Sequence, residues 1–405
     1  MNNTVVIAGA GHSAGQLIAS LKQQKFDGEI VLLGEEAYLP YQRPPLSKKY
    51  LAGELKAERL LFKPTSFYED DNLTIALQTR VCEISCANKT VRTEGGKDIP
   101  YSTLVLALGS RAREVPVAGT GLQGVHYLRG IVDVDALRRD IGPGKKAVIV
   151  GAGYIGLEVA AVCRQLGLDV TVVEMTDRVM SRVVSPQVST FFQRVHEQHG
   201  VKFCLSTGLK AIHGSGRVSS VEIESGENLP ADIVLIGAGI LPNSELAEDA
   251  GLDVDNGIVV DARCQSSDPH VYAIGDCSSH PSDIYGRRIR LESVHNALEQ
   301  AKTAASNICG VENHYSQVPW FWSDQYDLKL QIAGLSEGYD QVVLRGIEDE
   351  QKFACFYLRD GRLIAVDAIN SPREFMQSKK LIAAQADVDP VLLADPALDL
   401  TQSGR

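Results

Sequence analysis

Two short glycine-rich motifs, each directly behind a run of β-branched and apolar residues, constrain the fold of this chain more than any other feature. Residues 9–14 (GAGHSA) follow the run Thr4–Ala8, and residues 151–156 (GAGYIG) follow residues 147–150. Both match the G-x-G-x-x-G/A pattern of a dinucleotide-binding unit, whose glycines allow a tight turn and close approach of the backbone to a pyrophosphate at a helix N-terminus. The sequence therefore predicts two bound nucleotides, and the usual reason to hold two is to pass a hydride between them.

An acidic residue ends the second predicted strand of each unit. Glu35 and Glu174 follow the first glycine of their motifs at close to the spacing of about 20 residues expected for an acid that bonds ribose hydroxyls. A carboxylate also repels a 2′-phosphate, so Glu174 favours NADH over NADPH. Arg178 and Arg182 follow soon after it and could reach a phosphate, which leaves NADPH as the alternative.

Length, charge and cysteine content limit the class of protein. A chain of 405 residues exceeds the roughly 250–300 at which single cores stop growing, which indicates two or three domains. No apolar run approaches the ~20 residues of a membrane span, and the first strand begins too early for a signal peptide, so we expect a cytoplasmic protein without membrane contact. A net charge of −11 disfavours nucleic acid as a partner. Eight scattered cysteines without a C-x-x-C motif indicate reduced, mostly buried thiols and no metal site.

Matching strand patterns indicate that one domain is inserted in another. Residues 103–111 close the first nucleotide-binding region and residues 232–239 close the second, with turn formers at Pro116, Gly119 and Pro242 near the crossings. We predict an α/β fold with two Rossmann-like dinucleotide-binding domains and a C-terminal α+β domain. The expected boundaries are residues 1–112 and 244–318 for the first domain, 113–243 for the second, and 319–405 for the third.

The residue pattern changes after Pro319, where short stretches of alternating apolar and polar residues begin. Residues 351–358 and 362–368 alternate like strands of an antiparallel sheet, and residues 359–361 predict a hairpin turn between them. Residues 374–386 are typical of one amphipathic helix. The tail after Pro390 predicts an extended or loosely held segment.

Further motifs are spread over the whole chain: residues 43–48 (RPPLSK), 273–276 (AIGD), 292–294 (ESV), 296–301 (NALEQA) and 319–325 (PWFWSDQ). With the two glycine motifs, they resemble those of FAD-containing, pyridine-nucleotide-dependent ferredoxin reductases of the putidaredoxin reductase type, which also serve aromatic-ring dioxygenases. The resemblance implies a glutathione-reductase-like fold in which the first motif holds FAD and the inserted domain holds NADH. It further implies electron transfer to a [2Fe–2S] ferredoxin that feeds a haem monooxygenase or a ring-hydroxylating dioxygenase.

The resemblance also implies cofactor contacts. The adenosine and pyrophosphate side of FAD is expected at Ser13, Glu35, Val81 and Arg129, the ribityl chain at Asp276, and the flavin ring at Val294. The other expected cofactor-binding residues are Gly9, Gly11, Ala14, Arg43, Lys48, Gly151, Gly153, Ile155, Gly156, Glu174, Arg182 and Gly239.

Lys48 and Glu158 are the residues expected nearest to the reacting atoms. Pro44 and Pro45 stiffen the backbone that leads to Lys48, and a lysine close to the flavin N5 can stabilise negative charge on reduced flavin. Glu158, two residues after the last glycine of the second motif, would be its ion-pair partner near the nicotinamide.

The aromatic segment and one basic segment are the expected ferredoxin-facing features. Trp320 and Trp322 share one face if they lie on a strand, and we expect Trp320 at the flavin or the docking surface, with an ordinary core position as the alternative. Residues 287–290 (RRIR) are the candidate basic patch for an acidic ferredoxin.

The absence of cysteine before Cys82 separates the chain from related enzyme classes. Disulfide reductases and single-cysteine peroxidases with the same two-nucleotide core carry a redox-active cysteine close to the flavin within the first ~60 residues. Electrons are therefore expected to leave the flavin for a protein. The alternatives are a rubredoxin reductase or an NADH oxidase and, from another class, a redox signalling protein resembling apoptosis-inducing factor.

Overall fold

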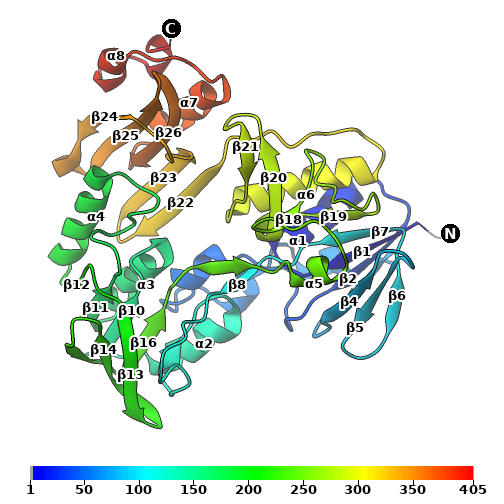
Figure 1. The fold of residues 1–405 in the computed structure, drawn as a ribbon, viewed down its shortest axis with the longest axis horizontal. Coiled ribbons are helices and arrows are strands. Elements are labelled where there is room, and N and C mark those ends of the chain that lie inside the picture. The colour runs from blue at the N-terminus through cyan, green and yellow to red at the C-terminus, as the bar shows by residue number, and fades with distance from the viewer. Residues whose placement is uncertain (1–2, 405) are drawn as a thin grey trace. The chain divides into compact units, whose positions relative to one another are not determined.

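The computed structural model describes residues 3–404, which form two compact units (Figure 1). The first takes in the described residues of Met1–Arg43, Glu58–Arg111 and Leu241–Pro319, and the second those of Pro44–Ala57, Ala112–Ile240 and Trp320–Arg405. Each glycine motif therefore lies in a different unit. The segment Pro44–Ala57, which carries Lys48, groups with the second unit although its neighbours in sequence belong to the first.

A five-stranded parallel sheet in the order β19-β7-β1-β2-β3 forms the centre of the first unit. Its strands are β1 (Thr4–Ala8), β2 (Glu29–Leu33), β3 (Leu73–Ala76), β7 (Thr103–Leu106) and β19 (Val271–Ala273). Two small sheets accompany it: β4 (Val81–Ser85), β5 (Thr90–Thr93) and β6 (Asp98–Pro100) form one, and β18 (Ile258–Val259), β20 (Ser278–Ser282) and β21 (Arg287–Ile289) form the other. The helices are α1 (His12–Gln23), α5 (Glu245–Asp249) and α6 (Val294–Ile308).

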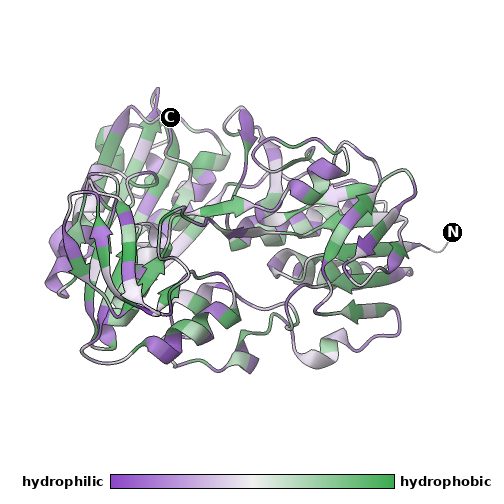
Figure 2. Cartoon of the chain, turned by 60° about the horizontal axis from the view of Figure 1, so that its bottom comes forward, coloured by the Kyte–Doolittle hydropathy of each residue, from purple (hydrophilic) through white to green (hydrophobic). Residues whose placement is uncertain are grey.

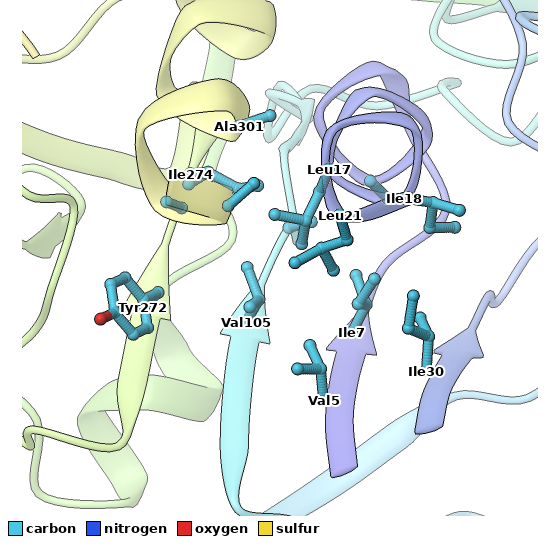
Figure 3. Packing of buried hydrophobic residues seen from close by; sticks show 14 of the residues in the cluster. Val5, Ile7, Leu17, Ile18, Leu21, Ile30, Val105, Tyr272, Ile274 and Ala301 are labelled. Carbon is cyan, nitrogen blue, oxygen red and sulfur yellow. The ribbon is translucent and has the colours of Figure 1, made fainter. Parts of the chain in front are cut away.

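Strand alternation divides the core of the first unit between the two faces of this sheet. Val5 and Ile7 of β1 face α1 and α6, where Leu17 and Ala301 are fully buried, as Figure 3 shows. Val6 and Ala8 of β1 belong to a second buried cluster on the opposite face. Each fully buried aliphatic side chain of this kind contributes roughly 1.5–3 kcal/mol to folding. The β-branched run before the motif thus fixes the strand whose end carries the glycine turn.

The second unit repeats this arrangement with a parallel sheet in the order β12-β11-β10-β16-β9. Its strands are β9 (Val125–His126), β10 (Lys146–Val150), β11 (Asp169–Val173), β12 (Lys202–Cys204) and β16 (Ile233–Ile236). The helices are α2 (Ile131–Asp140), α3 (Tyr154–Gln165) and α4 (Pro186–Gln198), and a small sheet contains β13 (Leu209–Ser215), β14 (Arg217–Ile223) and β15 (Asn228–Pro230). Where the chain passes between the units, β8 (Ser110–Ala112) pairs with β17 (Ile240–Pro242). Figure 2 shows the hydrophobic residues concentrated on the strands.

The C-terminal part of the second unit contains an antiparallel sheet in the order β22-β23-β26-β25-β24. The strands are β22 (Trp320–Gln325), β23 (Leu328–Gly334), β24 (Gln341–Ile347), β25 (Lys352–Arg359) and β26 (Arg362–Ile369). The predicted hairpin turn is confirmed, because Asp360 and Gly361 link β25 to β26 with φ angles of 52° and 78°. Two successive positive φ angles suit the right-handed twist of the joined strands.

The prediction for the C-terminal tail is wrong. The expected helix 374–386 is α7 (Pro372–Ala383), and the segment after it forms α8 (Pro390–Ala394), with Leu393 and Leu400 fully buried. Arg345, which is only 3% exposed, donates hydrogen bonds to the carbonyl oxygens of Leu393, Asp395 and Leu398. These carbonyls accept from both terminal nitrogens of a buried guanidinium, which holds the tail against the sheet.

All eight cysteines are free, and four of them (Cys163, Cys264, Cys277 and Cys355) are buried. Within residues 3–404, no cluster of His, Cys, Asp and Glu side chains could hold a metal ion. Among the helices described, none combines the length and apolar character needed to cross a membrane.

Candidate functional site

The second glycine motif forms an open turn between β10 and α3. A Cβ on Gly151, whose φ is +102°, would lie 2.3 Å from the carbonyl oxygen of Gly237, and a Cβ on Gly156 would lie 2.1 Å from the carbonyl oxygen of Gly151. Both positions therefore exclude any side chain. A Cβ on Gly153 would meet nothing within 4 Å. The free space at Gly153, at the start of α3, fits the approach of a pyrophosphate.

The first motif has the same design in its own unit. A Cβ on Gly9, whose φ is +104°, would lie 2.2 Å from the carbonyl oxygen of Ala107, while a Cβ on Gly11 would meet nothing within 4 Å. Ser13 and Ala14 are buried in the first turn of α1. The donors and the space expected for a second pyrophosphate are therefore present.

The acids at the ends of the second strands differ in their surroundings. Glu174 accepts a hydrogen bond from the backbone N–H of Ala152 at 2.7 Å and two from Thr176, both at 3.0 Å. The side chain of Glu35 is 70% exposed, and its guanidinium neighbour Arg80 lies 3.8 Å away. Both carboxylates retain lone pairs for ribose hydroxyls, and Glu174 is already oriented towards its motif.

Asp276 lies in a single helical turn (Gly275–Cys277) directly after β19. It accepts a hydrogen bond from the Ser110 hydroxyl at 2.7 Å. Gly275 has a φ of +81°, and its N–H donates to the buried amide oxygen of Gln300 at 2.7 Å. A Cβ on Gly275 would lie 3.1 Å from Ser13 Oγ, so the first motif and this turn are neighbours. Val294 begins α6 after its N-cap Ser293.

Arg43 is held by an acid and a phenol of its own unit. Its guanidinium donates to Glu36 at 2.5 Å and to the Tyr41 hydroxyl at 3.0 Å. Burial opposes the charge of Arg43, but Tyr41, Glu36 and Asp276 together outweigh burial and raise its pKa. The residue remains cationic in a region that also contains Asp276.

Lys48 and Glu158 form a buried ion pair within the second unit. The distance between Lys48 Nζ and Glu158 Oε2 is 2.7 Å, and the side chains are 16% and 2% exposed. Ser47 donates to the same oxygen at 2.5 Å, and Ser323 of β22 donates to Glu158 Oε1 at 2.7 Å. The ion pair expected from the resemblance is therefore present in the structure, and the two serines are partners that the sequence analysis did not assign.

The segment that carries Lys48 is fixed at several points. Tyr50 donates to Asp135 of α2 at 2.8 Å, and Lys48 Nζ also lies 3.3 Å from the carbonyl oxygen of Pro44. Glu158 lies on the second turn of α3, behind Gly153, so the glycine turn and the ion pair occupy the same helix. Lys48 is thus held by Glu158 of α3 and by the Pro44 carbonyl oxygen, and its segment is anchored to α2 through Tyr50.

Trp320 and Trp322 lie on one face of β22, as predicted. Their ring centroids are 5.6 Å apart, Phe375 of α7 meets Trp320 edge-on at 5.7 Å, and Lys379 Nζ lies 5.4 Å from the Trp320 ring. Both tryptophans are partly exposed. The alternate residue Ser323 points to the opposite face and reaches Glu158.

Comparison with known proteins identifies the family. A model of the pyridine nucleotide-disulphide oxidoreductase family matches residues 3–301, and a reductase C-terminal model matches residues 320–403. The chain belongs to the pyridine nucleotide-disulphide oxidoreductase family. The fold and the two motifs of this family imply binding of FAD and of a nicotinamide nucleotide.

Within the family, the chain is similar to ferredoxin reductases over its whole length. A ferredoxin–NAD(P)+ reductase of Sphingomonas sp is 43% identical, with 98% of this chain and 96% of that protein covered. Rhodocoxin reductase of Rhodococcus erythropolis is 42% identical, with coverage of 98% and 93%. The crystal structure of the covalent putidaredoxin reductase–putidaredoxin complex matches with a TM-score of 0.96 and 40% identity, over 99% of this chain and 98% of that chain.

For the other residues expected to bind cofactors in this oxidoreductase, the structure gives exposure and backbone contacts only. Arg182 and Ile155 are exposed, and Gly239, with a φ of +95°, has open space around its Cα. The backbone N–H of Arg129 donates to Asp133 at 2.9 Å, and Val81 is buried at the start of β4. Their contacts with nucleotides remain predictions.

Arg178 and two arginines of the segment 287–290 bind groups of the protein itself. Arg178 donates to the carbonyl oxygens of Val184 and Ser181 at 2.8 and 2.7 Å, which reduces its freedom to meet a phosphate. In the segment 287–290, Arg288 donates to the carbonyl oxygens of Val260 and Ser279, and Arg290 pairs with Glu292 at 2.8 Å. Arg287 is the exposed cation of that segment.

Proposed function

We propose that this flavoprotein transfers hydride from NADH to FAD and passes single electrons to a [2Fe–2S] ferredoxin that feeds a haem monooxygenase or a ring-hydroxylating dioxygenase. The observation that carries the proposal is the buried Lys48–Glu158 pair, whose carboxylate lies on the helix that begins at the second glycine motif. The names of the similar reductases and the absence of cysteine before Cys82 support it.

The residues of each unit suit different parts of this reaction. We assign FAD to residues 1–112 and 244–318, with Ser13, Arg43 and Asp276 as its main polar contacts, and NADH to residues 113–243. When bound, FAD accepts two electrons from NADH and releases them singly, as an iron–sulfur cluster requires. The protein orients the two nucleotides and supplies fixed charge.

The Lys48–Glu158 pair supplies that charge. The Glu158 carboxylate, which accepts hydrogen bonds from Ser47 and Ser323, keeps the Lys48 ammonium in place. A positive charge fixed in this way stabilises negative charge that develops close to it, and the protein does not have to reorganise. Because Glu158 is only 2% exposed, removal of Lys48 would leave a buried anion without its partner. We therefore expect Lys48→Met to slow hydride transfer more strongly than it weakens NADH binding.

Preference for NADH rests on Glu174. Its carboxylate is oriented by Ala152 and Thr176, so a 2′-phosphate would meet a fixed negative charge. The nearby Arg178 is bonded to backbone carbonyls. We assign Trp320, which is partly exposed on β22, to the electron exit and docking region.

The test is stopped-flow reduction of the bound flavin by NADH and NADPH, followed by cytochrome c reduction with a [2Fe–2S] ferredoxin, with a rubredoxin, and with neither. We expect fast reduction by NADH, slow reduction by NADPH, and cytochrome c turnover only with ferredoxin. Equal turnover without any added protein, accompanied by oxygen consumption, would indicate an NADH oxidase. Turnover only with rubredoxin would indicate a rubredoxin reductase.

A further inference from the structure

A chain of buried side chains continues from Glu158 along one face of the C-terminal sheet to α4. Ser323 Oγ lies 2.7 Å from Glu158 Oε1, Gln325 Nε2 lies 3.1 Å from Ser323 Oγ, and Gln325 Oε1 lies 2.8 Å from His196 Nε2. The Tyr326 hydroxyl completes the chain at 3.3 Å from His196 Nδ1. Ser323, Gln325 and His196 are at most 1% exposed. The chain therefore links α3, β22 and α4, and it is shielded from water between Glu158 and His196.

The direction of these hydrogen bonds follows from Glu158. A carboxylate paired with Lys48 can only accept, so the single hydroxyl proton of Ser323 must point to it. Ser323 Oγ must then accept from the NH₂ group of Gln325, which places the amide oxygen against His196. His196 must carry its proton on Nε2, and Nδ1 accepts from Tyr326. The charge of Glu158 and the hydrogen-bond geometry together decide the orientation of the Gln325 amide.

The surroundings of His196 agree with a neutral ring. The pKa of His196 is lowered to about 4, mainly by burial and also by the charge of His199 at the C-cap of α4, while the hydrogen bond to Gln325 opposes both. The other groups that face the ring are Tyr326, with a centroid distance of 5.0 Å, and the apolar ring of Phe203 at 6.2 Å. None of these groups is an acid that would favour a protonated imidazole.

We propose that Gln325 is a positioning residue for the Lys48–Glu158 pair: it fixes the chain Tyr326–His196–Gln325–Ser323 in one direction, with every donor oriented towards the Glu158 carboxylate. Hydrogen bonds aligned in this way strengthen one another in a low-dielectric interior. An amide cannot exchange its donor and acceptor ends as a hydroxyl or imidazole can, so Gln325 also prevents a proton from reaching Glu158 along the chain. The consequence for hydride transfer rests on the function proposed above, whereas the direction of the chain does not.

The experiment combines a spectroscopic and a kinetic measurement on the FAD-loaded protein. Nitrogen NMR of histidine-labelled protein, assigned with His196→Asn, should show the Nε2–H tautomer of His196 and no titration between pH 5 and 8. Stopped-flow reduction by saturating NADH should fall roughly 10-fold in Ser323→Ala, which removes a donor from the buried carboxylate, and in Gln325→Met, which removes the group that orients Ser323. The dissociation constant of NADH should be unchanged.

Matched variants separate positioning from general stability. Ser323→Thr retains the hydroxyl and should restore most of the rate. Gln193→Met removes an exposed hydrogen bond to Glu197 on α4, the helix that carries His196, and should leave both rate and tautomer unchanged. An Nδ1–H tautomer at His196, or a Gln325→Met protein with the original rate at every pH, would overturn the proposal. If NADH fails to reduce the flavin of the unaltered protein, the proposed function fails instead, and the tautomer still decides the direction of the chain.

Discussion

The two glycine motifs share a pattern but tolerate side chains differently. At the third position, the first motif has the fully buried Ala14, whereas a Cβ on Gly156 would lie 2.1 Å from the carbonyl oxygen of Gly151. At the second position the motifs agree, because a Cβ on Gly11 or on Gly153 would meet no protein atom within 4 Å. The third position therefore depends on packing within the protein, and the second position is open for a ligand.

The acids that follow the motifs show the same contrast. Glu174 is oriented by the backbone N–H of Ala152 and by Thr176, whereas Glu35 is 70% exposed with Arg80 at 3.8 Å. The acid that we assign to ribose binding in the second unit is thus oriented by the protein itself. The first unit leaves its acid free to adjust.

The largest effect is expected from changing the third position. Gly156→Ala would force the backbone of α3 away from Gly151, and overpacking of this kind costs about 1–3 kcal/mol or more. We expect the rate of flavin reduction by NADH to fall roughly 100-fold and the second unit to unfold earlier in urea. Ala14→Gly should cost only about 1 kcal/mol, the usual loss for glycine in a helix. Equal effects of the two changes would show that the third position is not governed by packing.

Changing the second position should affect ligands and leave the fold intact. Gly11 and Gly153 have φ angles of −89° and −77° with extended ψ, so alanine fits both without strain. Its methyl group would occupy the space where a pyrophosphate approaches; a steric conflict of about 2 kcal/mol corresponds to roughly 30-fold in affinity. Gly11→Ala should lose FAD during purification, whereas Gly153→Ala should keep FAD and bind NADH roughly 30-fold more weakly.

Thermal unfolding of the FAD-free proteins provides the control, and it should not distinguish either variant from the unaltered chain. Loss of FAD in Gly153→Ala, or weaker NADH binding alone in Gly11→Ala, would reverse the assignment of the two nucleotides. This pair of variants therefore tests which unit holds which cofactor.

Local sequence patterns could predict the strands, the glycine turns and the hairpin at Asp360, since each depends on neighbours in sequence. The Lys48–Glu158 pair was accessible only through resemblance, because its members lie 110 positions apart. Ser323 and Gln325 are polar residues at alternate positions of β22. Nothing in the neighbouring sequence indicates that the face of the strand they share packs against α3. The alternation at residues 320–325 was the only signal available for them.

The error in the C-terminal tail has a physical origin. The tail after Pro390 has the composition of a free end, but its leucines are buried and its carbonyls satisfy Arg345, a residue distant in sequence. The basic patch at residues 287–290 stays a prediction, although its Arg288 and Arg290 also bind groups of the same unit. Composition predicts exposure, but long-range polar partners decide it.

The smallest expected effect is on the pH dependence of stability, and it compares one buried histidine in each unit. Burial lowers the pKa of His280 in the first unit and of His196 in the second to about 4 in both cases, with Arg288 and His199 adding to the effect. Between about pH 4 and the ordinary histidine value near 6.5, the unfolded chain therefore binds more protons than the folded protein. Stability is complete above about pH 6.5 and is lost as the pH falls towards 4. At pH 5 each histidine should cost its unit about 2 kcal/mol.

Asparagine at either position should remove that loss, and the two variants should differ at neutral pH. His196 forms hydrogen bonds with Gln325 and Tyr326, whereas His280 receives one from Gln300 at 3.1 Å. His196→Asn should therefore be the less stable variant at pH 7.5, by about 1 kcal/mol for the additional hydrogen bond. Both tryptophans of the chain lie in the second unit, so their fluorescence in urea reports on His196→Asn, and flavin fluorescence reports on His280→Asn. A loss of stability between pH 7.5 and 5 that is unchanged in both variants would assign the acid sensitivity to other groups.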